Sequence, residues 1–483
     1  MQPKVIQRIL GLLLMVFSFT MLPPVIVGLI YNEGVVIHFL QGFALVFFIG
    51  LLIWLPSRNH RNELKLRDGF VVVVMFWVTL SFSGTVPLYL SPEPAMSLTD
   101  AVFESVSGLT TTGATVLTGL DDLPKSILFY RQQLQWLGGM GIVVLAVALL
   151  PLLGVGGMQL YKAEISGPIK DNRFTARISE TAKALWYIYL GLTIIAALSY
   201  KVLGMDWFDA IGHAFSTVAI GGFSTHDDGF GYYDSPALEG AATLFMAIAG
   251  VSFALHFLAL RSASLRTYLK NSEFRLYAGI LITLLILYTL SLWLSGTYDS
   301  LAEAWRYASF NAVSYATTTG FATADITAWP FFLPVLLVMA AFVGGCAGST
   351  AGGIKVLRLL LLIRQGLREL QQLVHPRAQM VVRIGGKPMP DSVMSAVWGF
   401  FSAYVGVFII LFLLMMASGL DEVSAFGAVG ATLTNLGPGL GEVANNFTTV
   451  SDFGKWVAIV AMLLGRLEIF TVLVLFTPMF WRR

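Results

Sequence analysis

Residues 99–114 read TDAVFESVSGLTTTGA, a short apolar segment that ends in three threonines and a glycine. A long apolar run at 69–90 precedes this segment, and a second run at 134–153 follows it. As a helix, 99–109 would be about 16 Å long at ~1.5 Å per residue, too short for the ~30 Å hydrocarbon core of a bilayer. We therefore expect the segment to enter a membrane and return, which is tolerated only where protein or water surrounds the backbone.

The composition of the whole chain is that of a polytopic helical membrane protein. Of its 483 residues, 56% are hydrophobic and 12% are charged, about half the charged fraction of a typical soluble domain. Charge-free runs at 9–31, 36–56 and 276–298 are long enough to span a bilayer, and we expect the first to be a retained helix rather than a cleaved signal. The net charge of +2 gives no indication of a nucleic-acid partner. The single cysteine, Cys346, excludes an internal disulfide and a cysteine-rich metal site.

Basic residues cluster in alternate loops, as the positive-inside rule predicts for a multi-pass protein. The basic segments lie at 4–8, 58–67, 162–183, 261–275, 355–387 and 482–483. The loops between them carry acids instead, namely Asp121, Asp122, Asp206, Asp227, Asp228, Asp234, Asp299, Asp421, Glu422 and Glu442. Each acid alone is equally typical of a solvated loop, but together they would raise the cation concentration at a pore mouth. We therefore expect the basic segments and both termini to be cytoplasmic.

The short segment and its flanking apolar runs recur four times along the chain. Alignment on a glycine brings four positions into register: Gly113, Gly222, Gly320 and Gly437. An alanine stands twelve residues before each glycine, and a small residue stands six before it: Ser107, Ser216, Ser314 and Ala431. Thirteen before stand Asp100, Asp209 and Ser424, which suit helix N-caps, whereas Tyr307 breaks this column. All four units start from the basic side, so they are parallel, unlike the units of inverted-repeat transporters.

These observations predict an all-α polytopic membrane protein. We expect four parallel helix–pore-loop–helix repeats around a pseudo-fourfold pore, plus two extra N-terminal transmembrane helices. The expected boundaries are 1–66 for the two extra helices, 67–163 for the first repeat, 164–271 for the second, 272–372 for the third, with an interrupted second helix, and 373–483 for the fourth.

Such a ring would favour a cation at its centre. The C-terminal ends of the short helices would place partial negative charge there, and loop carbonyls without regular partners can replace a hydration shell, as in potassium channels. The four loops read Thr110-Thr111-Thr112-Gly113, Ala219-Ile220-Gly221-Gly222, Thr317-Thr318-Thr319-Gly320 and Thr434-Asn435-Leu436-Gly437. Because the side chains differ while the glycine recurs, we expect the backbone to coordinate the ion. The alternative, small residues that pack helices, explains one such cluster better than four in register.

Further motifs carry a resemblance to a known family. They are Tyr130-Arg131-Gln132 with Gln135-Trp136-Leu137-Gly138-Gly139-Met140-Gly141, Ile220-Gly221-Gly222-Phe223-Ser224-Thr225, Gly344-Gly345-Cys346-Ala347-Gly348-Ser349-Thr350, and Asn435-Leu436-Gly437-Pro438-Gly439. With these motifs the chain resembles the Trk/Ktr/HKT superfamily of potassium transporters over essentially its whole length. The two extra N-terminal helices make it most similar to the membrane subunit of bacterial Trk potassium-uptake systems. The resemblance implies potassium uptake across the bacterial inner membrane.

The resemblance also implies ligands and partners. Potassium, the transported ion, would bind the carbonyls of the two residues before each aligned glycine: Thr111 and Thr112, Ile220 and Gly221, Thr318 and Thr319, and Asn435 and Leu436. Glycine at all four positions resembles the potassium-selective members, since some sodium-conducting relatives carry serine at the first. The family forms homodimers and binds a cytosolic nucleotide-binding ring, TrkA. This chain has no nucleotide motif, so nucleotide sensing would belong to such a partner.

Two features are candidates for a gate. Residues 344–353 hold five glycines, interrupt the second helix of the third repeat, and lack the spacing of a phosphate-binding loop. The resemblance makes this segment a flexible gate beneath the filter, moved by the partner; the alternative is a closely packed helix seam. Its candidate gate residues are Gly345, Cys346, Ala347, Gly348, Ser349, Thr350, Gly352 and Gly353. Arg466, expected in the middle of a helix at 455–478, should face the interior, as a positive barrier or as a packing residue bound to carbonyls. It should not pair with Glu468, which points to another face.

The remaining polar residues suggest no catalytic site. The six histidines, which have no metal-ligand spacing, are expected to be structural: His38, His60, His213, His226, His256 and His375. We expect Glu104 to hydrogen-bond behind the first loop or to pack there. An alternative function is a potassium symporter coupled to protons or sodium, for which only Glu104 and Glu468 are candidate intramembrane carboxylates. An ammonium or sodium pathway also stays open, whereas no constellation of residues supports an intramembrane enzyme.

Overall fold

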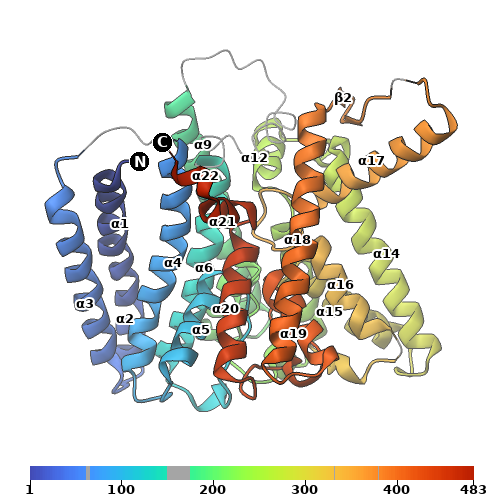
Figure 1. The fold of residues 1–483 in the computed structure, drawn as a ribbon. Coiled ribbons are helices and arrows are strands. Elements are labelled where there is room, and N and C mark those ends of the chain that lie inside the picture. Colours follow the sequence, from blue (N-terminus) through green and yellow to red (C-terminus); the bar gives the residue numbers. More distant parts are fainter. Residues whose placement is uncertain (61–65, 149–173, 331, 379, 483) are drawn as a thin grey trace.

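The computed structural model describes residues 1–60, 66–148, 174–330, 332–378 and 380–482. These residues are helical apart from loops and one antiparallel hairpin of β1 (Arg383–Ile384) and β2 (Lys387–Pro388). Among them, six helices are long and apolar enough to cross a membrane, and two bent helix pairs could each add a span. Both termini lie at the same end of the bundle (Figure 1). The expected boundary at 163–164 lies outside the described residues, as do several of the basic residues: Arg61, Lys65, Lys162, Lys170, Arg173 and Arg483.

Two helices precede the repeats, as predicted. The first consists of α1 (Pro3–Ser18), η1 (Phe19–Met21) and α2 (Leu22–Ile30), and the second of α3 (Val36–Trp54) and η2 (Leu55–Ser57). They pack through glycines: a Cβ built on Gly11 would lie 2.8 Å from the carbonyl oxygen of Gly50. Small residues of this kind let helix backbones approach closely within a membrane.

Each of the four repeats has the predicted order of a long helix, a short helix, a loop and a second long helix. The first contains α4 (Leu66–Leu90), α5 (Leu98–Leu109), η3 (Leu120–Asp122) and α6 (Lys125–Ala148). The second contains α9 (Phe174–Val202), α10 (Trp207–Ala219), η4 (Gly229–Tyr233), α11 (Pro236–Ala249), α12 (Phe253–Ser262) and α13 (Arg266–Lys270). The third contains α14 (Ser272–Leu294), α15 (Leu301–Ala316), η5 (Ile326–Ala328), α16 (Leu333–Val343) and α17 (Val356–Val374). The fourth contains α18 (Asp391–Ala417), α19 (Glu422–Leu433), η6 (Gly441–Val443), α20 (Asp452–Arg466), α21 (Phe470–Leu473), η7 (Val474–Phe476) and α22 (Pro478–Trp481).

The N-caps of the short helices α5, α10 and α19 lie three residues before the predicted caps, and α15, for which no cap was predicted, is capped in the same way. Their N-cap side chains each accept a hydrogen bond from the backbone N–H three residues later, and these caps are Ser97, Asp206, Ser300 and Asp421. Asp100, Asp209 and Ser424 were therefore wrongly predicted as caps, because they supply the N–H that the cap binds. Tyr307 lies inside its helix, as do the equivalent Asp100, Asp209 and Ser424, and α15 starts one turn earlier than the other three relative to its aligned glycine.

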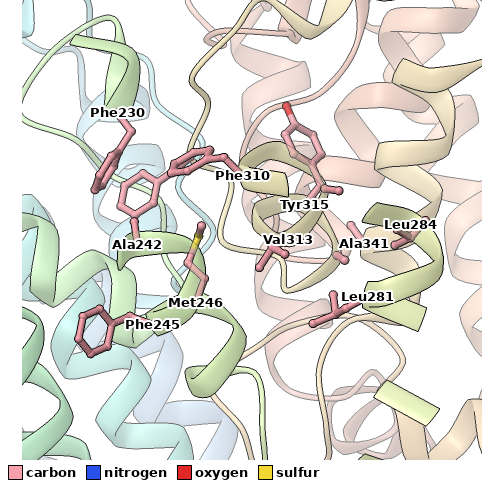
Figure 2. Packing of buried hydrophobic residues seen from close by; sticks show 14 of the residues in the cluster. Phe230, Ala242, Phe245, Met246, Leu281, Leu284, Phe310, Val313, Tyr315 and Ala341 are labelled. Atoms are coloured by element: carbon pink, nitrogen blue, oxygen red, sulfur yellow. The ribbon is translucent and has the colours of Figure 1, made fainter. Parts of the chain in front are cut away.

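The short helices are deeply buried. In α5, every residue from Ala101 to Leu109 is buried, and α10, α15 and α19 end in similar buried runs. A hydrophobic cluster extends across repeats two and three, from Phe230 and Met246 through Phe310 and Val313 to Leu281 (Figure 2). Helices too short to span a membrane are thus enclosed by protein, as re-entrant backbone requires.

The second long helices of three repeats break. In repeat three, residues 344–355 separate α16 from α17, as predicted. In repeat two, α11 and α12 meet at 93°, and in repeat four α20 meets the segment from Phe470 to Phe476 at 103°. The sequence predicted neither bend. The prediction that Arg466 lies in the middle of a helix was wrong, because it ends α20 just before Glu468 and Ile469, which have positive φ.

Candidate functional site

The four aligned glycines form a closed ring. A Cβ built on each glycine would fall on the carbonyl oxygen of the residue before the glycine of the next repeat. The separations are 2.1 Å from Gly113 to Gly221, 2.0 Å from Gly222 to Thr319, 2.0 Å from Gly320 to Leu436 and 2.7 Å from Gly437 to Thr112. Repeat one thus contacts two, two contacts three, three contacts four, and four contacts one. The loops ending at these glycines, the ring loops, encircle one axis.

Along each ring loop, residues with positive φ alternate with a residue whose φ is not positive. Positive φ occurs at the glycine and at the residue two before it, whereas the residue between them has no such φ. The non-glycine values are 50° at Thr111, 54° at Ile220, 67° at Thr318 and 56° at Asn435. Alternation of this kind turns successive peptide groups to one side of the chain. Positive φ is unusual for β-branched residues, and such strain of ~1–3 kcal/mol persists only where the surroundings impose it.

The small residue six positions before each aligned glycine stabilises these conformations. Its carbonyl accepts the backbone N–H of the residue just before the glycine, and this occurs in all four repeats. The N–H···O distances are 2.9 Å for Thr112–Ser107, 2.8 Å for Gly221–Ser216, 2.7 Å for Thr319–Ser314 and 2.8 Å for Leu436–Ala431. These bonds fix the peptide planes at the C-terminal ends of the short helices, where the helix dipole is negative.

The second ring loop has an additional support from α6. Gln135 Nε2 donates to the carbonyl oxygen of Gly221 at 2.6 Å, and its Oε1 accepts the backbone N–H of Phe223 at 3.1 Å. In repeats one and three, threonine hydroxyls pair within the loop instead, Thr110 with Thr112 and Thr317 with Thr319. The carbonyl of Gly221 keeps a second lone pair. Gln135 thus supports the loop that has no threonine.

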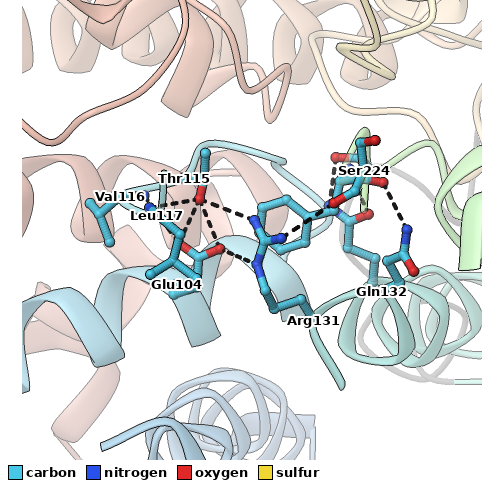
Figure 3. A network of polar contacts seen from close by, with 10 residues as sticks. Glu104, Thr115, Val116, Leu117, Arg131, Gln132 and Ser224 are labelled. Carbon is cyan, nitrogen blue, oxygen red and sulfur yellow. Dashed lines mark hydrogen bonds and ion pairs between the residues drawn. The ribbon is translucent and has the colours of Figure 1, made fainter. Parts of the chain in front are cut away.

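A buried ion pair lies behind the first two ring loops. Arg131 Nε of α6 donates to Glu104 Oε1 of α5 at 2.6 Å, and both side chains are at most 1% exposed. The carboxylate also accepts the hydroxyl of Thr115 and the backbone N–H of Val116. Arg131 Nη1 reaches the carbonyl of Ser224 at 3.4 Å, so the guanidinium lies between repeats one and two (Figure 3). This confirms that Glu104 hydrogen-bonds behind the first loop.

The glycine-rich loop, residues 344–353, lies against the C-terminal ends of three short helices. Thr350 Oγ1 donates to the carbonyl of Val218 in repeat two at 3.0 Å. Gly352 N donates to the hydroxyl of Thr318 in repeat three at 2.7 Å, and Gly353 N to the carbonyl of Thr434 in repeat four at 3.0 Å. A Cβ on Gly352 would lie 1.9 Å from that last oxygen. The loop therefore packs directly beneath the ring, where only glycine backbone fits.

Arg466 contacts the same loop from the end of α20. It is 6% exposed, and its Nη1 donates to the carbonyl of Thr350 at 3.0 Å. Its Nε and Nη2 have no hydrogen-bond partner among the residues the structure describes. Glu468 pairs instead with Arg358 of α17 at 2.5 Å, which confirms that Arg466 and Glu468 form no ion pair of their own. Arg466 is thus a buried cation bound to the glycine-rich loop.

A family model supports this architecture. The model of TrkH, described as a cation transport protein, matches residues 36–483. The chain belongs to the TrkH family. TrkH relatives include the Trk system potassium uptake proteins TrkH of Halomonas elongata, 55% identical over 100% of both chains, and of Escherichia coli K12, 54% identical over 99% of each. The crystal structure of the potassium transporter TrkH from Vibrio parahaemolyticus matches with a TM-score of 0.93 and 53% identity over the whole of both chains.

Membership of the TrkH family confirms the predicted fold class and the resemblance drawn from the loop motifs. A cation transport protein is a transporter, so the expectation that the chain is not an enzyme is also confirmed. Among the described residues, no group of three or more His, Cys, Asp or Glu side chains could hold a metal ion. Cys346, the single cysteine of the chain, is buried in the glycine-rich loop.

Several residues that position the TrkH ring loops had no role in the sequence prediction. Arg131, Gln132 and Gln135 entered it only as part of a motif. Gln135 donates to the ring-loop carbonyl of Gly221, and the other two donate to the carbonyls of Ser224 and Phe223, just after that loop. A signal was available, because three long polar side chains in an apolar helix need buried partners. His226 also binds two repeats: its ring nitrogens contact Asp121 of repeat one and Asp209 of repeat two.

Proposed function

We propose that this chain takes up potassium across the bacterial inner membrane through the centre of the ring. The proposed ligands are the carbonyl oxygens of the two residues before each glycine: Thr111, Thr112, Ile220, Gly221, Thr318, Thr319, Asn435 and Leu436. The observation that carries this proposal is the closed ring, in which each repeat contacts the next through a glycine and a carbonyl. Four loops around one axis can replace the hydration shell of a cation with backbone oxygens.

Selectivity for potassium would rest on the backbone geometry of the ring. Glycine at 113, 222, 320 and 437 lets the neighbouring carbonyl occupy space that a side chain would fill. Hydrogen bonds from the loops to the short helices resist contraction of the ring around a smaller ion. This favours potassium over the sodium alternative.

The glycine-rich loop is the proposed gate, with its residues 345–350, 352 and 353 beneath the ring. Its support is the set of hydrogen bonds to helix ends of repeats two, three and four, which a permeating ion would have to displace. Arg466 is the proposed positive barrier. Its Nε and Nη2 have no hydrogen-bond partner among the described residues. They belong to a buried cation that would lie next to the conduction axis, where it would repel another cation.

Regulation would come from outside the membrane. We propose a homodimer with both termini cytoplasmic, and a TrkA-like nucleotide-binding subunit that acts on α17. Helix α17 leads directly out of the glycine-rich loop and projects from the bundle at the end that holds both termini (Figure 1). It carries exposed Arg364, Leu367 and Leu370, a surface that suits a soluble partner. The repeat boundaries given above remain part of this proposal.

A channel is favoured over a potassium symporter. Coupled transport by protons or sodium calls for an intramembrane carboxylate that can change its partner. The two candidates are held by arginines, Glu104 by Arg131 and Glu468 by Arg358. An arginine that holds a carboxylate in a buried ion pair opposes the change of partner that coupling requires.

Electrical recording from purified protein in planar bilayers tests this proposal. The reversal potential of a channel follows the potassium equilibrium potential at all proton and sodium gradients. A symporter would reverse at a potential that shifts with the coupling ion, which would overturn the channel. Rescue of a potassium-uptake-deficient bacterium, with and without the cytosolic partner, tests uptake and regulation separately. Failure of rescue by a well-expressed chain in both strains would contradict potassium uptake.

A further inference from the structure

The glycine-rich loop has a second set of contacts on the side away from the ring. Glu273, in the first turn of α14, is 3% exposed, and its Oε1 accepts the backbone N–H of Ala347 at 2.6 Å. A short bond between a carboxylate and a backbone N–H is about twice as strong as a neutral one. The first long helix of repeat three is thus attached to the middle of its own glycine-rich loop, 74 residues further along the chain.

The same part of the loop also pairs with the bend between α11 and α12. Cys346 N donates to the carbonyl of Gly250 at 2.8 Å, and Phe253 N donates to the carbonyl of Gly348 at 3.1 Å. The bend of repeat two therefore satisfies loop groups that a continuous α11–α12 helix would leave without partners. This gives a structural reason for a break that has no glycine-rich sequence.

One turn further along α14, Tyr277 fastens the bend to the same helix. Its hydroxyl donates to the carbonyl of Ala247 at 2.9 Å, and a Cβ on Gly250 would lie 2.2 Å from that hydroxyl oxygen. Residues four apart share one helix face, so Glu273 and Tyr277 together hold the loop and the bend. Neither residue belongs to the ring.

We propose that Glu273 is a positioning residue that keeps the glycine-rich loop in its blocking position. This proposal rests on the proposed role of the loop as a gate. The ring-side contacts of the loop are neutral hydrogen bonds and the contact with Arg466, whereas the far-side contacts include, besides two backbone bonds to the bend, a bond to a buried carboxylate. Loss of the carboxylate removes the bond to Ala347, and the loop then leaves the axis more often.

The test measures potassium flux from proteoliposomes without the cytosolic partner. Glu273→Ala should raise this basal flux about tenfold and Glu273→Gln about threefold, as expected for the loss or weakening of one charged hydrogen bond. The reversal potential in mixed potassium and sodium should stay unchanged, because the ring loops are not touched. Glu180→Gln, which removes an exposed carboxylate of α9, is the matched control and should leak no more than the parent chain.

A chain that lacks residues 346–350 separates the two proposals. If this deletion raises basal flux while Glu273→Ala and Glu273→Gln do not, the positioning role is overturned and the gate stands. If the deletion leaves basal flux unchanged, the gate itself is wrong. A merely structural role for Glu273 would lower the flux and protein yield together, and that result would also overturn the proposal. The near-isosteric Gln variant keeps the test valid if the Ala variant does not fold.

Discussion

Replacing Gly222 with alanine tests the ring most directly. The added Cβ would lie 2.0 Å from the carbonyl oxygen of Thr319, whereas real Cβ contacts essentially never fall below 3.0 Å. The oxygen must therefore retreat by at least 1 Å along that contact. Since Thr319 supplies one of the proposed ligands, the coordination of the ion would be broken on one side. We expect potassium uptake to fall at least tenfold, equal to ~1.4 kcal/mol, with a loss of preference for potassium over sodium.

Backbone strain has to be separated from this displacement. Gly222 has φ +81°, where an L-residue costs ~1–2 kcal/mol. Gly119 has φ +69° and nothing within 4 Å of its built Cβ, so Gly119→Ala carries the strain without the clash. Gly437→Ala, whose Cβ meets Thr112 O at 2.7 Å, calls for a smaller displacement of the oxygen. The expected order of lost uptake is Gly222, then Gly437, then Gly119, with the last near the parent value.

Uptake is measured in a bacterium without its own potassium transporters, and selectivity from the reversal potential of the purified protein. Membrane abundance of each variant is measured alongside, so that poor expression is not mistaken for lost conduction. Normal selectivity in Gly222→Ala would refute the assignment of the ring as the filter. Equal losses in Gly222→Ala and Gly119→Ala would show that strain alone, rather than the carbonyl, accounts for the effect.

Three further predictions follow from the polar contacts. Glu104→Gln leaves Arg131 buried without its anion, which costs ~3–5 kcal/mol. The melting temperature of this variant should fall, and a second substitution, Arg131→Met, should restore part of the lost stability. Burial alone would lower the pKa of His226, but its bonds to Asp209 and Asp121 outweigh burial and raise it. The stability that His226 adds is therefore complete below pH 6.5, its ordinary pKa, and is lost as pH rises through the folded pKa. Melting curves of His226→Asn should differ from those of the parent chain at acidic pH and converge with them at alkaline pH. A difference that grows with pH would contradict this. Arg466→Ala should raise basal flux several-fold while Arg466→Lys does not, and unchanged flux in the alanine variant would remove the barrier.

The ring could be predicted because its determinants are local. Each ring loop needs a short helix, a small residue six before the glycine, and the glycine itself, and all three lie within one stretch of chain. The backbone bonds between the small residue and the loop close over only five residues. Because four copies of this pattern align, the sequence supports the assignment of the four loops to one ring, which a single copy would not support. The cap positions were missed by three residues because Asp100 and Asp209 follow a second polar residue that forms the cap.

The bends in repeats two and four could not be predicted because distant partners determine them. The bend after α11 contains one glycine, Gly250, and its backbone groups pair with a loop about 100 residues away. The bend after α20 contains no glycine, and Glu468 takes a positive φ of 56° while its side chain binds Arg358. Local sequence patterns predict neither contact, because the residues that stabilise these turns belong to another repeat.

A single chain of four unequal repeats permits the proposed gate, which four identical subunits could not build. The glycine-rich loop contacts the helix ends of repeats two, three and four. A side chain would not fit at this contact, because a Cβ on Gly352 would lie 1.9 Å from the carbonyl oxygen of Thr434. Four copies related by rotation would compete for the same space beneath the ring. The four repeats avoid this conflict because they differ in structure. Repeat three supplies the loop, and the second long helices of repeats two and four bend where they contact it. In repeat one, α6 continues as a helix past Gly138, beside the end of α5. The fourfold symmetry is therefore retained where the ion would be bound and lost immediately beneath, where the pathway would be closed.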